Sequence, residues 1–387
     1  MLHSELELRR DKIRALMAAR SIDAALICCN VNLLYTCGTV VCGYFYLPLH
    51  GPATLFVKRP NNLTGEHIHP IRKPEQLPDL LRDCGLPLPA RLMLEGDELS
   101  YGEYTRLAAC FPDAEVLPCG TSLVRQARAV KTETEIELFR RSGMALTKAY
   151  EQIPTVYRPG MTDRQLSVEV ERLVRLAGGL GIFRVFGRSM EVFMGSLLAG
   201  DNAAAPSPYD FALGGAGLDA SLPVSASGSL IRPGQSIMVD MGGNFYGYMG
   251  DMSRVYSVGR LPEKAYAAHQ TCLEIQDTIV AKARPGAVCG DLYDLAVDIA
   301  RRNGFADYFM GVGQKAKFVG HGIGLEINES PVLAPRVAQT LEPGMVFALE
   351  PKIVLPGIGP LGVENSWAVT ATGLEKLTLC GEDIVEL

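Results

Sequence analysis

The sequence predicts a two-domain protein in which an α/β domain is followed by an α+β domain. Its 387 residues exceed the size of one ordinary hydrophobic core and suit two domains. In roughly the first 122 residues, apolar runs alternate with helical patterns, which is typical of an α/β domain. In the second half, glycine-punctuated stretches with alternating apolar residues predict antiparallel strands joined by tight turns.

The overall composition is that of a folded globular protein, because 48% of the residues are hydrophobic and 21% are charged. A net charge of −6 provides no broad positive field, so we expect neither a nucleic-acid partner nor an anionic membrane partner. Apolar runs stay well short of the roughly 18 residues that span a bilayer. The first 20 residues form a charged amphipathic helix without the apolar core of a signal peptide, which predicts a cytoplasmic protein.

The cysteines give the same prediction about the compartment. None of the ten forms a CxxC pair, and seven lie in the first 119 residues. This spacing matches neither a zinc site nor a compact disulfide scaffold, whereas a thiol is commonly a small buried apolar group. We therefore expect reduced and mostly structural cysteines.

Three apolar runs bounded by glycine, proline or charge predict strands in the N-terminal domain, at residues 22–29, 51–59 and 90–97. Helical patterns lie between and after these runs, at about 74–84 and 101–111. Strands that alternate with helices in this way predict a sheet with helices packed against it.

A change of pattern marks the domain boundary near residue 125. Thr132 and Glu135 have the spacing of a capping box and begin a long amphipathic helix, and Thr162 and Gln165 repeat the same signal. The predicted domains are residues 1–125 and 126–387.

The C-terminal domain groups its strands and helices rather than alternating them. Residues 234–259 are rich in glycine and aromatic residues and predict antiparallel strands. Two helical segments follow at 262–283 and 290–303, and further strands are expected from residue 318 onward. This order predicts an α+β domain.

Four carboxylates and one histidine stand out in the glycine-punctuated strands of this domain. They are Asp240, Asp251, His321, Glu350 and Glu364. An acid at the end of an apolar run is unusual, because a buried charge costs several kcal/mol unless it is paired or bound to a metal.

Each of the five has an ordinary explanation when it is taken alone. Asp251 has Arg254 nearby for a surface ion pair, Glu350 precedes a proline at a strand end, and His321 lies between glycines in a loop. Taken together, four carboxylates in one core repel strongly unless cations lie between them. One imidazole with four carboxylates suits two divalent metal ions, Mn²⁺, Co²⁺, Fe²⁺ or Zn²⁺, better than Mg²⁺ or Ca²⁺.

The motifs around these residues resemble those of the M24 metallopeptidases, which include Xaa-Pro aminopeptidase, prolidase, methionine aminopeptidase and their relative creatinase. The likeness rests on Asp-x10-Asp, "GHGIGLE", Glu-Pro and a glutamate fourteen residues later. The stretches "ARSIDAALIC", "RAVKTETEIELFRRSG" and "TATGLEKLT" extend it over almost the whole chain. The resemblance implies a creatinase/prolidase-type N-terminal domain, a pita-bread catalytic domain and a homodimer.

The resemblance also implies a role for each of the five residues. Asp240 would chelate one metal ion, His321 and Glu350 would bind the other, and Asp251 and Glu364 would bridge both. A hydroxide held between the two metal ions would attack the scissile carbonyl of a short peptide. The resemblance thus predicts an aminopeptidase or dipeptidase that prefers Xaa-Pro substrates. Glu350 would shuttle its proton to the leaving nitrogen.

Three positions depart from the pattern of the family's proline-directed peptidases. Val224 stands where a histidine upstream of the first aspartate is usual, Asn328 replaces a second histidine, and Gly362 replaces an arginine. After residue 150 the chain has only two histidines, His269 and His321, and we expect His269 to be structural. One missing donor to a tetrahedral oxyanion costs on the order of 10²–10³ in rate.

These departures leave three hypotheses open. Cleavage of Xaa-Pro peptides would need substitute donors, for which Arg184, Arg188, Tyr246 and Tyr248 are candidates. Arg184 or Arg188 could instead meet a substrate carboxylate, and Asn328 can donate through its amide but cannot carry a proton. The alternatives are a hydrolase of a different small amide and a metal-binding protein with little turnover.

Overall fold

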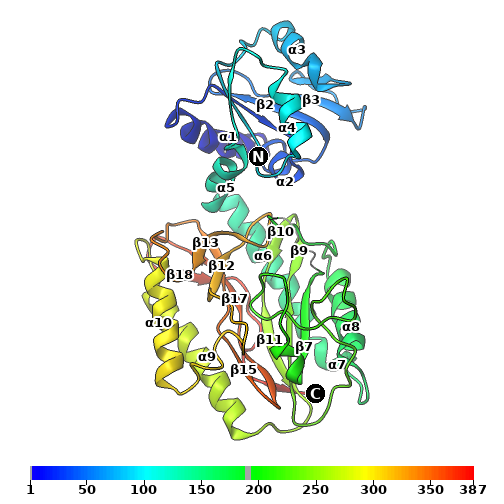
Figure 1. Ribbon diagram of the computed structural model, residues 1–387, viewed down its shortest axis with the longest axis vertical. Coiled ribbons are helices and arrows are strands. Elements are labelled where there is room, and N and C mark those ends of the chain that lie inside the picture. Colours follow the sequence, from blue (N-terminus) through cyan, green and yellow to red (C-terminus); the bar gives the residue numbers. More distant parts are fainter. Residues whose placement is uncertain (1, 188–192) are drawn as a thin grey trace. The chain divides into compact units, whose positions relative to one another are not determined.

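The computed structural model describes residues 2–187 and 193–387 of the chain. The chain divides into two compact units, Met1–Arg128 and Ala129–Leu387 (Figure 1). The division falls inside helix α5 (Gly120–Ala129), a few residues after the position expected from the sequence. In the described part of the chain, no helix combines the length and the apolar character needed to cross a bilayer.

The N-terminal unit is a mixed sheet with helices packed against it. Its elements are α1 (Leu2–Ala18), β1 (Ala24–Ile27), α2 (Asn30–Cys37), β2 (Cys42–Pro48), β3 (Thr54–Arg59), β4 (Ile68–Pro70), η1 (Pro74–Gln76), α3 (Leu77–Asp83), β5 (Arg91–Leu94), α4 (Tyr101–Ala108) and β6 (Glu115–Leu117). The six strands have the order β4-β3-β2-β1-β5-β6, and β1 pairs in parallel with β5 and antiparallel with β2. This confirms the predicted α/β class.

The core of this unit lies between the sheet and helices α3 and α4, which the sequence predicted at about residues 74–84 and 101–111. Leu26, Phe56 and Leu92 from the strands pack with Leu81 and Leu107 from the helices. Helix α4 begins where its capping residue predicts, because Ser100 Oγ accepts a hydrogen bond from the Glu103 amide and the Glu103 side chain bonds back to Ser100.

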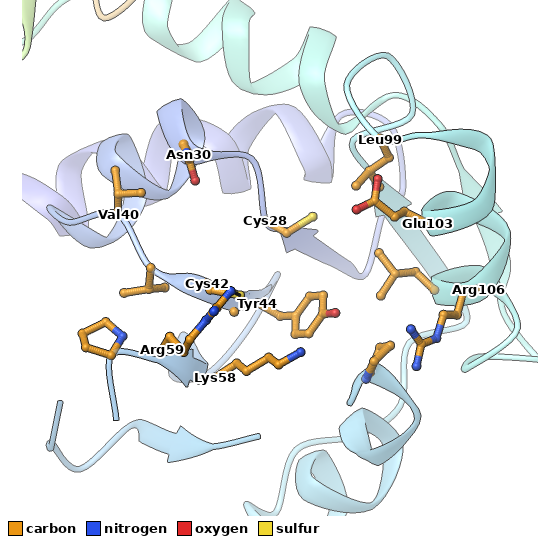
Figure 2. A pocket seen from close by; sticks show the side chains of 15 residues that line it. Cys28, Asn30, Val40, Cys42, Tyr44, Lys58, Arg59, Leu99, Glu103 and Arg106 are labelled. Atoms are coloured by element: carbon orange, nitrogen blue, oxygen red, sulfur yellow. Dashed lines mark hydrogen bonds between the residues drawn. The ribbon is translucent and has the colours of Figure 1, made fainter. Parts of the chain in front are cut away.

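A cavity of about 680 Å³ in the N-terminal unit is lined by residues of β2, β3 and α4, among them Tyr44, Lys58 and Arg106 (Figure 2).

The thiols of Cys28 and Cys29 lie near the buried Glu95 carboxylate. The Glu95 oxygens already accept hydrogen bonds from the amides of Cys28 and Cys29 at 2.6 and 2.7 Å, and from Asn32 Nδ2 at 2.7 Å. This carboxylate therefore serves to cap the start of α2.

Over its described residues, 129–187 and 193–387, the C-terminal unit contains two larger sheets and two short ribbons. Its helices are α6 (Glu133–Tyr150), α7 (Ile153–Val156), α8 (Asp163–Leu176), η2 (Gly200–Ala204), α9 (Glu263–Lys282) and α10 (Cys289–Arg302). Its strands are β7 (Gly195–Ala199), β8 (Ser236–Met241), β9 (Gly243–Phe245), β10 (Tyr248–Gly250), β11 (Ser253–Ser257), β12 (Gly320–Gly322), β13 (Glu329–Leu333), β14 (Val346–Leu349), β15 (Lys352–Leu355), β16 (Gly359–Gly362), β17 (Asn365–Val369), β18 (Leu374–Lys376) and β19 (Val385–Glu386).

The two larger sheets have the orders β19-β11-β8-β7 and β13-β12-β14-β17-β18, and β10-β9 and β15-β16 form the ribbons. Helices α6 and α8 pack with β7 and β8 in one apolar cluster, and α9 and α10 pack with β14 and β15 in another. The helices thus flank the strands on both sides (Figure 1). Apart from the parallel pair β11–β19, the strands are antiparallel and the helices are segregated from them, which confirms the predicted α+β class.

Both predicted capping boxes begin the helices expected of them. Thr132 Oγ1 accepts from the Glu135 amide at the start of α6, and Thr162 Oγ1 accepts from the Gln165 amide at the start of α8. The Tyr150 hydroxyl near the end of α6 lies 2.7 Å from the Met241 carbonyl oxygen and 2.5 Å from that of Met252, and it accepts from the Met241 amide at 2.9 Å. Tyr150 therefore fixes the main chain next to two candidate ligands, Asp240 and Asp251.

Candidate metal centre

The structure brings all five predicted residues together within the C-terminal unit. Two sets of three have ligand atoms within 4.8 Å of one another: Asp251, His321 and Glu364 form one set, and Asp240, Glu350 and Glu364 form the other. Glu364 belongs to both sets. Asp251, Glu350 and Glu364 are at most 6% exposed, and Asp240 and His321 are partly buried, so the charges face one another rather than water.

Strand register explains why residues so far apart in sequence converge. In the antiparallel pair β8–β11, Asp240 lies opposite Ser253, and Ser253 forms a bridge with Glu364. Ser253 Oγ donates to Glu364 Oε2 at 2.6 Å, which orients that carboxylate. In the second sheet, His321 pairs with Ala348, two residues before Glu350.

The ordinary explanation for Asp251, a surface ion pair with Arg254, does not hold. Asp251 is 6% exposed and Arg254 is 2% exposed. The Arg254 guanidinium instead donates to the main-chain oxygens of Ser253, Glu364, Cys380 and Gly381 and to Oδ1 of Asn365. Arg254 therefore positions the backbone around the cluster, and the Asp251 carboxylate stays available inside it.

His321 is oriented as a metal-binding imidazole. Its Nδ1 lies 3.3 Å from the Gly322 carbonyl oxygen, and since a carbonyl only accepts, Nδ1 carries the proton. Its Nε2 faces the acids, 3.5 Å from Asp251 Oδ2 and 3.3 Å from Glu350 Oε1. A main-chain acceptor on one ring nitrogen with the other aimed at carboxylates is the usual arrangement around a bound metal ion.

The crowding of acids is reflected in the pKa values. Burial, followed by the charge of Glu364, raises the pKa of Asp251 well above its ordinary value. Burial opposes protonation of His321, but the Glu350 and Asp251 carboxylates outweigh it and raise the pKa of His321 to about 10. A divalent cation would satisfy the same carboxylates, so a cation and a proton compete for His321 Nε2.

Lys352 is a member of the cluster that the sequence analysis missed. Its side chain is fully buried, and its Nζ lies 2.7 Å from Asp240 Oδ2, 2.5 Å from Glu350 Oε2 and 3.3 Å from Glu364 Oε2. A signal for it was present, because residues two apart along an extended chain point to the same side. Lys352 follows Glu350 at that spacing in "LEPKIVL".

Gly362, one of the noted departures, lies directly across from Lys352 in the β15–β16 ribbon. Its φ of 142° falls in a region that favours glycine, and a Cβ there would lie 2.4 Å from the Pro351 carbonyl oxygen. The two strands therefore approach so closely that only glycine fits beside Lys352. Val224, another departure, is 4% exposed, in the segment between η2 and β8.

Asn328 holds a neighbouring segment in place. Its Oδ1 accepts from the Phe186 amide at 2.8 Å, and its Nδ2 donates to the Phe186 carbonyl oxygen at 2.8 Å. The Ile327 amide donates to the Arg184 carbonyl oxygen, which adds a third hydrogen bond between the same two segments. The expected substrate contacts of Arg184 and Asn328 stay predictions, and Arg188 lies outside the described residues.

The two tyrosines named as candidate oxyanion donors, and His269, each make a contact elsewhere in the C-terminal unit. Tyr248 is buried and its hydroxyl donates to Glu135 Oε1 at 2.8 Å, whereas Tyr246 is 54% exposed with the Arg141 guanidinium over its ring. His269 is 5% exposed, and its Nε2 lies 2.7 Å from the Glu382 carbonyl oxygen, which agrees with the structural role expected for it.

Comparison with known proteins matches each of the two parts of the chain to a family model. Residues 137–371 match the model of metallopeptidase family M24, and residues 9–130 match the creatinase/prolidase N-terminal domain. An uncharacterized peptidase of Bacillus subtilis, YqhT, is 26% identical over 98% of this chain and 100% of its own length. The Xaa-Pro dipeptidase of Pyrococcus furiosus is 26% identical over 96% of this chain and 97% of its own.

Solved structures show the same architecture. The Xaa-Pro dipeptidase from Bacillus anthracis superposes with a TM-score of 0.81 at 25% identity, covering 99% of this chain and 100% of that one. The prolidase from Pyrococcus horikoshii OT3 gives a TM-score of 0.77 over 97% of this chain and 99% of its own, at 24% identity, which supports the fold alone. The chain therefore belongs to metallopeptidase family M24, a family of divalent-metal-dependent peptidases, and joins a creatinase/prolidase N-terminal domain to a pita-bread catalytic domain.

Proposed function

We propose that the chain hydrolyses short peptides with a divalent metal ion and prefers Xaa-Pro substrates, as an Xaa-Pro dipeptidase or aminopeptidase. The observation that carries this proposal is the convergence of His321 with Asp251, Glu350 and Glu364, two of which also lie beside Asp240. The Xaa-Pro preference is supported by relatives that bear the name Xaa-Pro dipeptidase and match nearly the whole chain.

The residues present fit a divalent cation. His321 supplies a nitrogen whose partner atom Nδ1 is already engaged, and Asp251, Glu350 and Glu364 supply carboxylate oxygens around it. This donor set suits Mn²⁺, Co²⁺, Fe²⁺ or Zn²⁺, with manganese the first metal to try. When bound, such a cation lowers the pKa of water towards neutrality and polarises the carbonyl under attack.

Glu350 is the group proposed to carry the proton. Burial raises its pKa, but the Lys352 ammonium and His321 outweigh burial and hold the pKa of Glu350 below its ordinary value. The group is therefore a carboxylate at neutral pH, able to accept a proton and then return it to the leaving nitrogen. Its Oε2 is held by Lys352 at 2.5 Å, so its position is fixed during the transfer.

A specific observation favours a second candidate function, the hydrolysis of a different small amide. The C-terminal unit has no imidazole to spare, since His269 bonds to Glu382 and Val224 and Asn328 stand at the usual histidine positions. The Asn328 amide is engaged with the main chain of Phe186. A substrate whose transition state needs fewer oxyanion donors would therefore suit this site better than an Xaa-Pro peptide. The third hypothesis is a metal-binding protein with little turnover.

Metal removal followed by reconstitution tests the proposal. We expect chelation to abolish hydrolysis of Xaa-Pro dipeptides, and Mn²⁺, Co²⁺, Fe²⁺ or Zn²⁺ to restore it. A panel of Xaa-Pro dipeptides, matched Xaa-Ala dipeptides, and guanidino and cyclic amides then ranks the substrate classes. Full Xaa-Pro turnover in the chelated protein would rule out the metal mechanism, and turnover of the small amides alone would favour the second candidate.

We also propose a cytoplasmic homodimer. All ten cysteines are free thiols, which supports a reducing compartment. The dimer rests on the resemblance to the family, and light scattering coupled to gel filtration tests it by giving the mass in solution against the 41.9 kDa of one chain.

A further inference from the structure

We propose that the Lys352 ammonium takes the place of one of the two cations expected from the sequence, so that the centre binds a single divalent metal ion. This inference rests on the proposed metal-dependent function and specifies the centre that carries it. The three partners of Lys352 Nζ are Asp240, Glu350 and Glu364, the complete second set of candidate ligands. The ammonium therefore lies where that set would hold a cation.

The chemistry of the ammonium matches this position. It is a compact positive charge with three N–H donors, and the structure offers one carboxylate oxygen to each of them. A metal ion of this class binds carboxylate oxygens at roughly 2.0–2.2 Å. A nitrogen 2.5–3.3 Å from the same oxygens occupies that space and repels a second cation from it.

In the described part of the chain, the other surroundings of the lysine are main-chain groups and apolar side chains. Its carbonyl oxygen accepts from the Met310 amide at 2.8 Å, and its strand is paired closely with Gly362. Around the ribbon lies the large apolar cluster that includes Cys272 and Ile353. An ammonium moved into such surroundings would lose its partners at a cost of several kcal/mol, so it stays among the carboxylates.

The first set of ligands remains open to one metal ion. Asp251, His321 and Glu364 lie within 4.8 Å of one another, and Glu350 Oε1 faces the same His321 nitrogen at 3.3 Å. One imidazole and three carboxylates are sufficient ligands for a catalytic cation with room for water. The ammonium and one divalent cation bring three positive charges to four carboxylates, which removes the electrostatic need for a second metal ion.

The number of metal ions bound per chain tests the inference. Metal-stripped protein is titrated with Mn²⁺ by calorimetry, and bound metal is counted by mass spectrometry after gel filtration. We expect one equivalent for the wild type and two for Lys352→Ala, which removes both the charge and the volume of the side chain. Lys131→Ala is the matched control, because Lys131 is also buried and pairs with Glu329 at 3.2 Å, and it should keep one equivalent.

Electron paramagnetic resonance provides a second readout on the same samples. Wild-type protein saturated with Mn²⁺ should give the spectrum of isolated ions, and Lys352→Ala should give that of a spin-coupled pair. Without metal, Lys352→Ala should melt at a lower temperature than the wild type, because three carboxylates lose their shared partner, and Mn²⁺ should recover most of the difference.

Two equivalents with a coupled spectrum in the wild type would overturn the inference, as would no metal binding at all. One equivalent in both the wild type and Lys352→Ala would also overturn it, because the lysine would then not be what excludes a second ion. If the variant does not fold, the wild-type stoichiometry still decides. Xaa-Pro turnover, measured on the same preparations, separates the two ideas: one equivalent without turnover contradicts only the proposed function, and two equivalents with turnover contradict only the inference.

Discussion

At the scale of single residues, the charged members of the centre differ in how visible they are in the sequence. Asp240, Glu350 and Glu364 each interrupt an apolar run, and burial of such a charge demands a partner, so their convergence could be expected. Lys352 was missed because a lysine after proline at the start of a strand is most often solvated. Only its register with Glu350 across the intervening proline places it in the cluster.

Gly362 gives a prediction about stability at this scale. Gly362→Ala combines a backbone conformation that favours glycine with a Cβ 2.4 Å from the Pro351 carbonyl oxygen. We expect it to lower the free energy of unfolding by about 3 kcal/mol in urea titrations. Gly373→Ala is the control, because its Cβ would meet nothing within 4 Å, and its effect should stay within about 0.5 kcal/mol. Equal effects of the two variants would contradict the close approach of β15 and β16.

His269 gives a prediction about pH dependence. Burial lowers its pKa in the folded protein and outweighs the nearby Glu382 and Asp383, whereas the unfolded chain has a pKa of about 6.5. The unfolded state therefore binds the proton more readily, so the stability linked to this group is complete above about pH 6.5 and is lost as the pH falls below it.

The variant His269→Gln does not titrate and can still donate to the Glu382 carbonyl oxygen. Between about pH 7 and pH 5, the free energy of unfolding should therefore fall more steeply for the wild type than for His269→Gln, by at most about 1.4 kcal/mol per unit of pKa difference. Parallel slopes in urea titrations would show that His269 is not buried in its neutral form.

At the scale of helices and strands, local signals were reliable where one interaction decides the element. The capping boxes at Thr132 and Thr162 predicted the starts of α6 and α8, because their side chains satisfy the amides that a helix start leaves open. Strands that depend on partners were harder. β2 (Cys42–Pro48) lies between two neighbours in its sheet, yet its glycine and proline conceal the strand pattern.

The pairing of Asn328 with residues 183–187 gives a prediction at this scale. In Asn328→Ala, the Phe186 amide loses its acceptor, so its hydrogen should exchange faster with deuterium. We expect KM for an Xaa-Pro dipeptide to rise because residues 183–187 are less ordered in the variant. The number of bound metal ions should be unchanged. Unchanged exchange at Phe186 would contradict the positioning role, and loss of metal would instead indicate that Asn328 supports the ligands directly.

At the scale of the whole molecule, composition and the order of elements were sufficient to predict two domains and their classes. The boundary expected near residue 125 and the division after Arg128 differ because α5 continues across it, and no composition signal marks a position inside a helix. The contact between Asn328 and the main chain of Phe186 could not be predicted in the same way. Which main-chain atoms Asn328 meets depends on tertiary packing between segments 142 residues apart.

Metal binding at the proposed centre should stabilise one unit only, because the five ligands of that centre all lie in Ala129–Leu387. At Mn²⁺ concentrations about 100 times Kd, the folded state gains about 2.7 kcal/mol. Hydrogen exchange followed by mass spectrometry should therefore slow in peptides from β8, β12 and β14 and stay unchanged in peptides from the N-terminal sheet. Equal slowing in both units would contradict a centre confined to the C-terminal unit.

The most direct test of the account is Xaa-Pro dipeptide turnover measured while Mn²⁺ is titrated into the metal-stripped wild-type protein. Asp251, His321, Glu350 and Glu364 form one open site, and Lys352 fills the other, so turnover should begin from zero and reach its maximum at one metal ion per chain. Full turnover without metal, or a maximum reached only at two ions per chain, would contradict it.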